Sequence, residues 1–234
     1  MKKLSFLTCL GCLLVASVAS ADIAVNPIAD TYVDSNNANS NFGALDFFVA
    51  NDNGSRDRFS LIRFDISSFS GTLTGAQLGL YDDIGDASEE FDIFGLDESA
   101  DTWTESLTHS QAVAAGLADT SIVGGFVTSN AFGGAPLTSF TDPAGDGTAH
   151  DAFDVTSGSI FDFLNADTDG LVSFVIVEPG AADVPGTGFS SRESTTASNR
   201  PLLTLTAAAV PEPSCSFTLL SLGLIAMIRR NRRS

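Results

Sequence analysis

The stretch Arg58–Ile66, which reads RFSLIRFDI, decides how this chain is interpreted. It is rich in β-branched and aromatic side chains, which favour strands. Apolar residues occupy both alternating phases, so both faces are expected to be buried. A second stretch, Gly75–Tyr81, instead alternates apolar residues with Gln77 and Gly79. The first is therefore predicted to be a central strand, and the second to have one buried and one more open face.

Similar short runs recur along the chain, separated by Gly, Asn, Asp and Ser, which favour turns. This pattern predicts an all-β fold, a single sandwich over residues 22–209. Two short connector helices are expected. One covers Thr108–Leu117, and the other is capped by Thr156 and ends at Leu164. The expected strands are Asp30–Asp34, Leu45–Ala50, Arg58–Ile66, Gly75–Tyr81, Phe91–Leu96, Ser121–Thr128, Leu137–Phe140, Ala149–Val155, Leu171–Glu178, Gly188–Glu193 and Leu202–Thr206.

The beginning of the chain has the organisation of an export signal. Lys2 and Lys3 precede an apolar core, Leu4–Val18, and the small residues Ala19 and Ala21 flank the end of that core. This order is typical of a signal peptide, residues 1–21, that signal peptidase removes after Ala21. Residues 22–209 are then expected to be exported.

The end of the chain has three parts. Val210, Pro211, Glu212 and Pro213 precede the mostly apolar run 214–228, and four arginines follow: Arg229, Arg230, Arg232 and Arg233. Arginines beside a membrane segment remain on its cytoplasmic side, so residues 22–209 are predicted to lie outside the inner membrane. As a helix, the run of 15 residues would be roughly 22 Å long, short for a hydrocarbon core of about 30 Å.

This arrangement resembles the PEP-CTERM sorting signal. The resemblance covers residues 210–234 and implies a short transmembrane helix that holds the chain in the inner membrane transiently, recognition by an exosortase, cleavage near the motif, and transfer to the cell surface or the extracellular matrix. An ordinary C-terminal membrane anchor is the alternative.

The charge of the exported segment limits its partners. All but one of the 29 acidic residues, but only five of the 11 basic ones, lie in residues 22–209. Such a surface repels nucleic acid and anionic membranes and attracts divalent cations. All three cysteines lie in the two terminal signals, so this segment contains no disulfide bond.

A second set of motifs spans nearly all of the exported segment and resembles DNRLRE domains. The motifs occur in the family's order: DTYV at 30–33, NFG at 41–43, LIRFDI at 61–66, AQLGLY at 76–81, TWTE at 102–105, FDVT at 153–156, FSSRE at 189–193 and NRPLL at 199–203. The resemblance implies a jelly-roll β-sandwich of secreted bacterial proteins, some of whose relatives are carbohydrate-binding modules for acidic polysaccharides. His109 departs from the pattern, because relatives often have a second Trp there.

Two acidic stretches are candidate calcium sites. Asn165, Asp167 and Asp169 repeat the first half of an EF-hand loop, but its twelfth position is Ile176 in place of Glu. The other stretch contains Asp82, Asp83 and Asp86, with Glu89 and Glu90 after them. Ordinary polar turns are the alternative at both places. Calcium is the cofactor that this pattern suggests.

Three residues are candidates for binding a sugar. Trp103, the sole Trp, either stacks on a sugar or belongs to the core. Arg63 is expected to pair with a carboxylate near Asp65 or with Glu193, and Arg192 with Glu193; alternatively the arginines contact a uronate, whose carboxylate suits the guanidinium fork.

The sequence therefore predicts an exported, non-catalytic protein that binds or organises polysaccharide. With two histidines, no HExxH motif and no GxSxG motif, no catalytic residue is assigned. The alternatives are a polysaccharide lyase or hydrolase with an unrecognised pair of carboxylates, and a structural matrix protein without a glycan ligand.

Overall fold

The computed structural model describes residues 21–52, 56–84, 88–122, 124–142, 147–180 and 187–208. Ala19, Asp86 and the whole of residues 210–234 lie outside this part of the chain, so the cleavage site and the sorting signal stay predictions. Within the described ranges, no helix has the length and apolar character needed to cross a membrane. Residues 21–208 form one compact unit.

The described residues form eleven strands, two α-helices and four single-turn 3-10 helices. The strands are β1 (Ala21–Val25), β2 (Pro27–Asp34), β3 (Phe47–Asp52), β4 (Asp57–Asp65), β5 (Leu73–Ile84), β6 (Glu89–Gly95), β7 (Thr138–Asp142), β8 (Ala149–Val155), β9 (Leu171–Val177), β10 (Thr187–Ser190) and β11 (Leu202–Ala207). The helices are α1 (His109–Ala114), α2 (Ser159–Ala166), η1 (Ser35–Asn37), η2 (Thr128–Asn130), η3 (Phe132–Gly134) and η4 (Ala197–Asn199).

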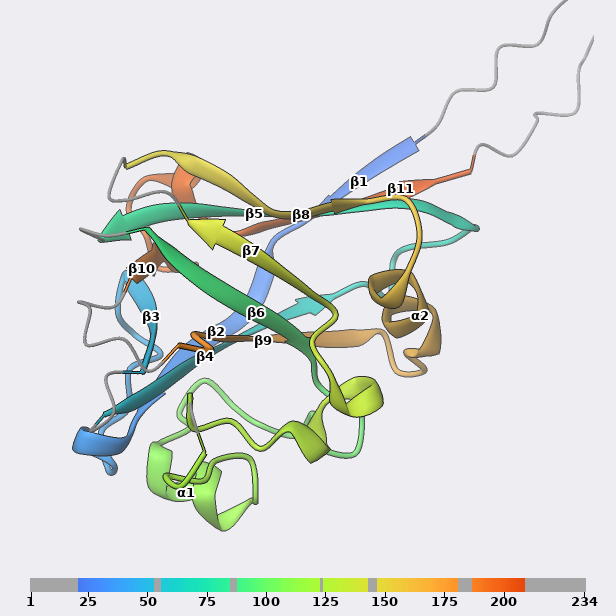
Figure 1. The fold of residues 1–234 in the computed structure, drawn as a ribbon. Helices are drawn as coiled ribbons and strands as arrows, with labels where there is room; N and C mark the ends of the chain where they lie inside the picture. Colours follow the sequence, from blue (N-terminus) through green and yellow to red (C-terminus); the bar gives the residue numbers. More distant parts are fainter. Residues whose placement is uncertain are drawn as a thin grey trace, which may run out of the picture. The chain divides into compact units, whose positions relative to one another are not determined.

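The strands lie in two layers, and all of their pairings are antiparallel (Figure 1). One layer contains β1, β11, β5 and β8; the other contains β2, β4, β9, β6 and β7. β10 pairs with β5 and β3, and β3 pairs with β4, so hydrogen bonding continues from one layer to the next. The predicted all-β fold with short connector helices is confirmed, as one large antiparallel sheet folded upon itself.

The main core lies between the two layers. Leu78 and Leu80 from β5 meet Phe64 from β4 and Phe174 from β9, and each is at most 1% exposed. The ring of Phe174 lies 5.4 Å from that of Phe153 in β8, so aromatic contacts cross from one layer to the other. Burying each such side chain stabilises the fold by about 1.5–3 kcal/mol. The alternation of β5 predicted this buried face correctly.

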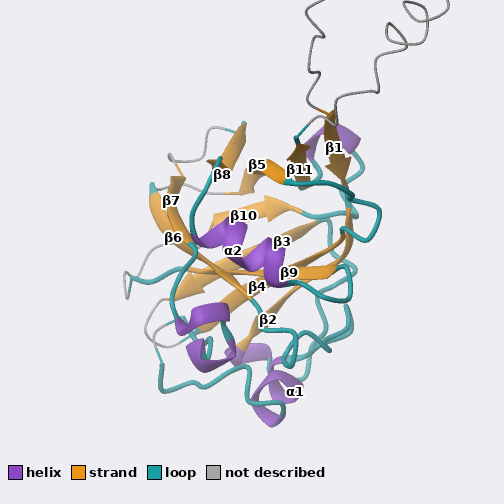
Figure 2. Cartoon of the chain, turned by 90° about the vertical axis from the view of Figure 1, so that its right-hand side faces the viewer, coloured by secondary structure: helices purple, strands orange, loops and turns teal. Residues whose placement is uncertain are grey.

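A second core covers the other face of β4. Phe59 and Leu61 point away from the main core and pack with Trp103, Leu117 and Phe126, which belong to the excursion of residues 96–131 that carries α1 (Figure 2). β4 also pairs with β2 on one side and β9 on the other. Both faces and both edges of β4 are therefore covered, which explains why its sequence is apolar in both phases, and its predicted central position is confirmed.

Two predictions about local structure are wrong, and one strand was not predicted. No strand forms among the described residues of 121–128, because Gly124 and Gly125 adopt φ angles of +72° and +71°, which an extended strand excludes. Helix α2 begins at Ser159 after Gly158, so Thr156 does not cap it. Finally, β1 was not predicted. It pairs with β11 along residues 203–207, and the sequence near β1 gives no indication of a pairing partner so far along the chain.

Candidate functional site

Trp103 and Arg63 form a buried stack. The Arg63 guanidinium lies 4.5 Å from the centre of the Trp103 ring, and the indole N–H donates to Ser173 Oγ at 2.9 Å. Trp103 is only 4% exposed. Its ring face contacts Arg63 and its indole N–H binds Ser173, both inside the protein. Of the two roles predicted for Trp103, stacking on a sugar or packing in the core, the structure places it in the core.

Arg63 is held by the loop that precedes Trp103. Its guanidinium forms an ion pair with Asp101 and donates to the carbonyl oxygen of Trp103 at 2.9 Å. The prediction that a carboxylate near Asp65 or Glu193 pairs with Arg63 is wrong. Arg63 lies on the same face of β4 as Phe59 and Leu61, the face against which the segment with Asp101 packs. Asp65 follows on that face, but it is exposed at the end of β4 and accepts hydrogen bonds from Ser67.

Arg192 joins motifs that are far apart in the sequence. Its Nε lies 2.6 Å from Glu193 Oε1 and 2.8 Å from Glu105 Oε1, and its backbone N–H donates to Asp30 Oδ2 at 2.7 Å. Asn41 donates to the carbonyl oxygen of Glu105 at 2.7 Å. The predicted pair of Arg192 with Glu193 is confirmed, and four of the ordered motifs meet at this cluster.

Asp30 is the buried member of this cluster, at 1% exposure. Its burial, together with the charges of Glu193 and Glu105, outweighs the hydrogen bond from the Arg192 backbone and raises the pKa of Asp30 to about 8. Asp30 therefore carries its proton at neutral pH. The guanidinium of Arg192 then lies against two further carboxylates, those of Glu105 and Glu193.

A surface cavity adjoins this cluster. It has a volume of about 480 Å³, and its lining residues are Asn26, Pro27, Arg192, Glu193, Ala197 and Arg200. Arg200 is exposed, and its Nε donates to the carbonyl oxygen of Ser194 at 2.9 Å. This hydrogen bond, made by Nε, orients the Arg200 side chain. The neighbouring Arg192 side chain is 36% exposed. The cavity thus combines two arginines, one carboxylate and one amide at the surface.

The EF-hand-like loop gathers two of its three predicted ligands. The carboxylate oxygens of Asp167 and Asp169 lie within 4.8 Å of each other and of Glu98, whereas Asn165 donates its amide to the carbonyl oxygen of Phe161 in α2. Burial, followed by the charges of Asp169 and Glu98, raises the pKa of Asp167 to about 6. A cavity of about 350 Å³ is lined by Glu98 and Asp167. Glu98 is distant in sequence and was not predicted.

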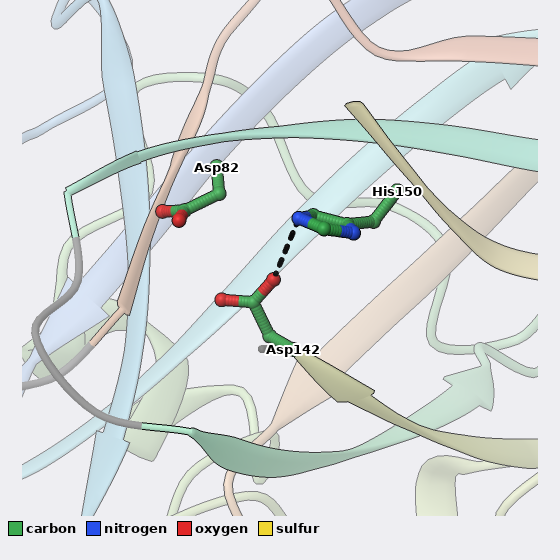
Figure 3. Close-up of side chains that lie close together, drawn as sticks. All are labelled: Asp82, Asp142 and His150. Carbon is green, nitrogen blue, oxygen red and sulfur yellow. Dashed lines mark ion pairs between the residues drawn. The ribbon is translucent and has the colours of Figure 1, made fainter. Parts of the chain in front are cut away.

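In the other acidic stretch, the neighbouring residues Asp82 and Asp83 of β5 lie on opposite faces of the strand. Asp82 is 1% exposed, whereas Asp83 is exposed. Asp82 is joined by Asp142 and His150, and one ligand atom from each of the three lies within 4.8 Å of the others (Figure 3). His150 Nε2 lies 3.4 Å from Asp142 Oδ1. Asp82 thus has partners from β7 and β8 that the sequence did not indicate.

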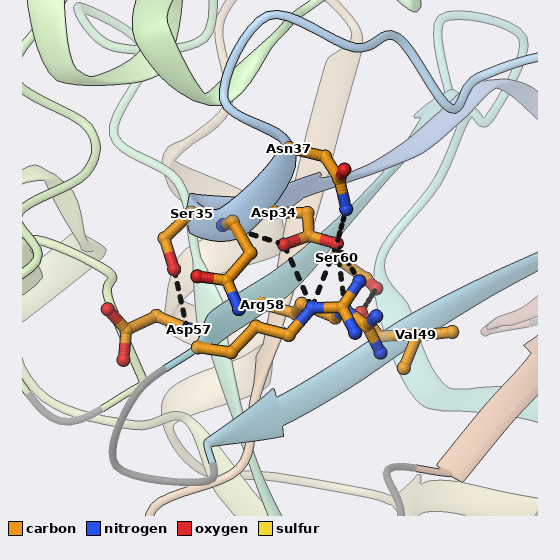
Figure 4. Close-up of polar contacts among 9 residues, drawn as sticks. Asp34, Ser35, Asn37, Val49, Asp57, Arg58 and Ser60 are labelled. Atoms are coloured by element: carbon orange, nitrogen blue, oxygen red, sulfur yellow. Dashed lines mark hydrogen bonds and ion pairs between the residues drawn. The ribbon is translucent and has the colours of Figure 1, made fainter.

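A buried ion-pair cluster closes one end of β2. Asp34, which is fully buried, pairs with Arg56 and, at 3.1 Å, with Arg58 (Figure 4). It also accepts hydrogen bonds from Asn36 N at 2.9 Å and from Asn37 Nδ2 at 3.0 Å. Burial opposes ionisation, but the bonds from Arg56 and Asn37 and the charge of Arg58 prevail and lower the pKa of Asp34 well below its ordinary range. This cluster is satisfied internally and has a structural role.

The comparisons with known proteins give a family match over part of the chain. Residues 21–116, less than half of the chain, match the model of carbohydrate-binding module family 96. This range runs from β1 into the residues after α1 and includes Asn26, Asp30 and Glu105. No curated protein matches the chain. Over residues 21–116, therefore, the chain is similar to carbohydrate-binding modules of family 96.

Proposed function

We propose that this protein is an exported, non-catalytic binder of polysaccharides that carry carboxylate groups. The match of residues 21–116 to a carbohydrate-binding module is the observation that carries the proposal. The cavity lined by Arg192 and Arg200 suggests the chemistry of the ligand. A planar carboxylate accepts two parallel hydrogen bonds from a guanidinium, and a uronate presents such a group on each sugar.

Arg200 is the residue best placed to contact the sugar. Arg192 is already bound to Glu193, Glu105 and the carbonyl oxygen of Ile28, so it mainly positions the cavity. Arg200 is anchored through Nε alone among the described contacts, and it is exposed. Asn26, on the link between β1 and β2, adds an amide from the matched range. We therefore assign the ion pair to Arg200 and a neutral hydrogen bond to Asn26.

Affinity electrophoresis of the purified full chain, in gels with an acidic uronan or a neutral glucan, tests this function. The uronan should retard the wild type. Arg200→Gln should bind about 10- to 150-fold more weakly, because one charge-assisted hydrogen bond contributes about 1.5–3 kcal/mol. Arg56→Gln is the matched control: it removes the same charge at the far end of β2, about 23 Å from Pro27 at 3.3 Å per residue. Because Arg56 also pairs with buried Asp34, binding by both variants is measured at a temperature well below their melting temperatures.

The outcomes separate the alternatives. Equal retardation of Arg200→Gln and Arg56→Gln would contradict the assignment of the cavity. No retardation by any polysaccharide would contradict glycan binding and favour a structural matrix protein. Release of unsaturated or reducing ends from the uronan would instead show a lyase or hydrolase.

The two terminal signals complete the proposal. Signal peptidase would remove residues 1–21, and an exosortase would process the chain near Val210–Pro213, which would transfer it from the inner membrane to the cell surface or the extracellular matrix. Mass spectrometry of the mature protein from its natural host tests both steps. A mature chain that retains Arg229–Arg233 would contradict the sorting step.

A further inference from the structure

We propose that Asp82, Asp142 and His150 form a binding site for one divalent cation of the zinc type, at the end of the sandwich where β5, β7 and β8 meet (Figure 3). This site is separate from the arginine-lined cavity and does not depend on glycan binding. The EF-hand-like loop is also a different place in the fold.

The spacing of the three side chains suits a small cation. One ligand atom from each residue lies within 4.8 Å of the other two, and Asp142 Oδ1 is 3.4 Å from His150 Nε2. Two ligands that each lie 2.0–2.1 Å from a tetrahedral zinc ion are about 3.3 Å apart. The Thr148 hydroxyl lies 3.2 Å from the same imidazole nitrogen, and a metal ion on that nitrogen would take the place of this contact.

A fourth buried side chain lies beside the three. Glu89 is opposite Asp142 in the pairing of β6 with β7 and is 5% exposed. Its Oε2 accepts from the Thr187 backbone at 3.0 Å, while its Oε1 is buried and has no hydrogen-bond partner among the described residues. Burying an ionised carboxylate costs several kcal/mol, and a bound cation offsets that cost.

The mixed donor set distinguishes zinc from calcium. Calcium prefers a shell of six to eight oxygen ligands. Here an imidazole nitrogen joins two carboxylates, which is a donor set that zinc and its transition-metal neighbours accept. With three protein ligands, a water molecule or the nearby Glu89 carboxylate completes a tetrahedral shell.

The site would join the two layers of the sandwich. Asp82 and His150 lie on β5 and β8, which pair in one layer, whereas Asp142 ends β7, which pairs with β6 in the other. The chain has no cysteine between Cys12 and Cys215, so no disulfide performs this task in residues 22–208. A metal that binds only the folded state contributes its binding free energy to folding.

The test compares zinc binding by the untagged full chain and two histidine variants. Zinc chloride is titrated by calorimetry, and thermal melting is followed with zinc or with a chelator. At zinc concentrations about 100 times the dissociation constant, the wild type should melt about 5–10 °C higher than with chelator. His150→Gln should lower the affinity about 100-fold, whereas His109→Gln, which changes the only other histidine, should leave it unchanged.

Two further measurements keep the test decisive. His150 is 17% exposed on its side chain, so His150→Gln is expected to fold; if it does not, Asp82→Asn replaces it in the same comparison. The cobalt-substituted wild type should show the strong visible absorption of a tetrahedral site. Zinc that binds equally to His150→Gln and wild type, zinc that does not change the melting of the wild type, or stabilisation by calcium alone would each overturn the proposal.

Discussion

Replacing Asp34 with Asn should remove a large part of the stability of this fold. Asp34 is fully buried and binds two guanidinium groups, those of Arg56 and Arg58 (Figure 4). An amide keeps one acceptor oxygen but turns an NH₂ group toward one of the arginines. Breaking a buried ion pair costs about 3–5 kcal/mol. We expect about 3 kcal/mol, since Arg56 is 28% exposed and water relieves part of the loss.

The assay is thermal and urea unfolding of the full chain at neutral pH. A loss of about 3 kcal/mol corresponds to a melting temperature roughly 6–12 °C lower for a domain of this size. Asp65→Asn is the matched control, because Asp65 is an exposed carboxylate at the end of β4 whose side-chain contacts among the described residues are with Ser67. Its melting temperature should change much less than that of Asp34→Asn.

The pH dependence provides a second measurement on the same variant. Because the folded pKa of Asp34 is lowered, its stabilisation is fully present above the ordinary carboxyl pKa, about 3.9, and is lost as the pH falls further. The difference between wild type and Asp34→Asn should therefore shrink below about pH 4. A difference that is no larger than for Asp65→Asn, or that is unaffected by acid, would refute this account of the cluster.

Two further predictions concern other carboxylates. Because the folded pKa of Asp30 is raised to about 8, its contribution to stability is fully present below the ordinary carboxyl pKa and declines as the pH rises to about 8. Asp30→Asn should flatten that decline in urea unfolding between pH 5 and pH 8; an unchanged slope would contradict it. If Asp167, Asp169 and Glu98 bind calcium, a calcium-selective chelator should lower the melting temperature of the wild type but not of Asp169→Asn. Equal melting of the wild type with and without that chelator would reject structural calcium.

Ten of the eleven strands could be predicted because their information is local; β1 was missed because its partner, β11, is distant in sequence. The apolar residues of Arg58–Ile66 occupy both phases, and a strand with that pattern needs cover on both faces. The alternation in Gly75–Tyr81 likewise identified the buried face of β5. What covers the outer face of β4 was not predictable, because Trp103, Leu117 and Phe126 come from an excursion whose path depends on long-range packing. The same excursion supplied Asp101 as the partner of Arg63.

The candidate sites show the same division. The sequence by itself determined the all-β class, the strongly acidic charge, the absence of disulfides from residues 22–208, the resemblance of both ends to sorting signals, and the pair of Arg192 with Glu193. Only the tertiary structure decided that the partners of Asp82 are Asp142 and His150, and that Asp83 is not among them. It also decided that Arg200 shares a cavity with Arg192. The physical reason is that neighbours in a strand point to opposite faces, whereas antiparallel pairing joins side chains that are many residues apart.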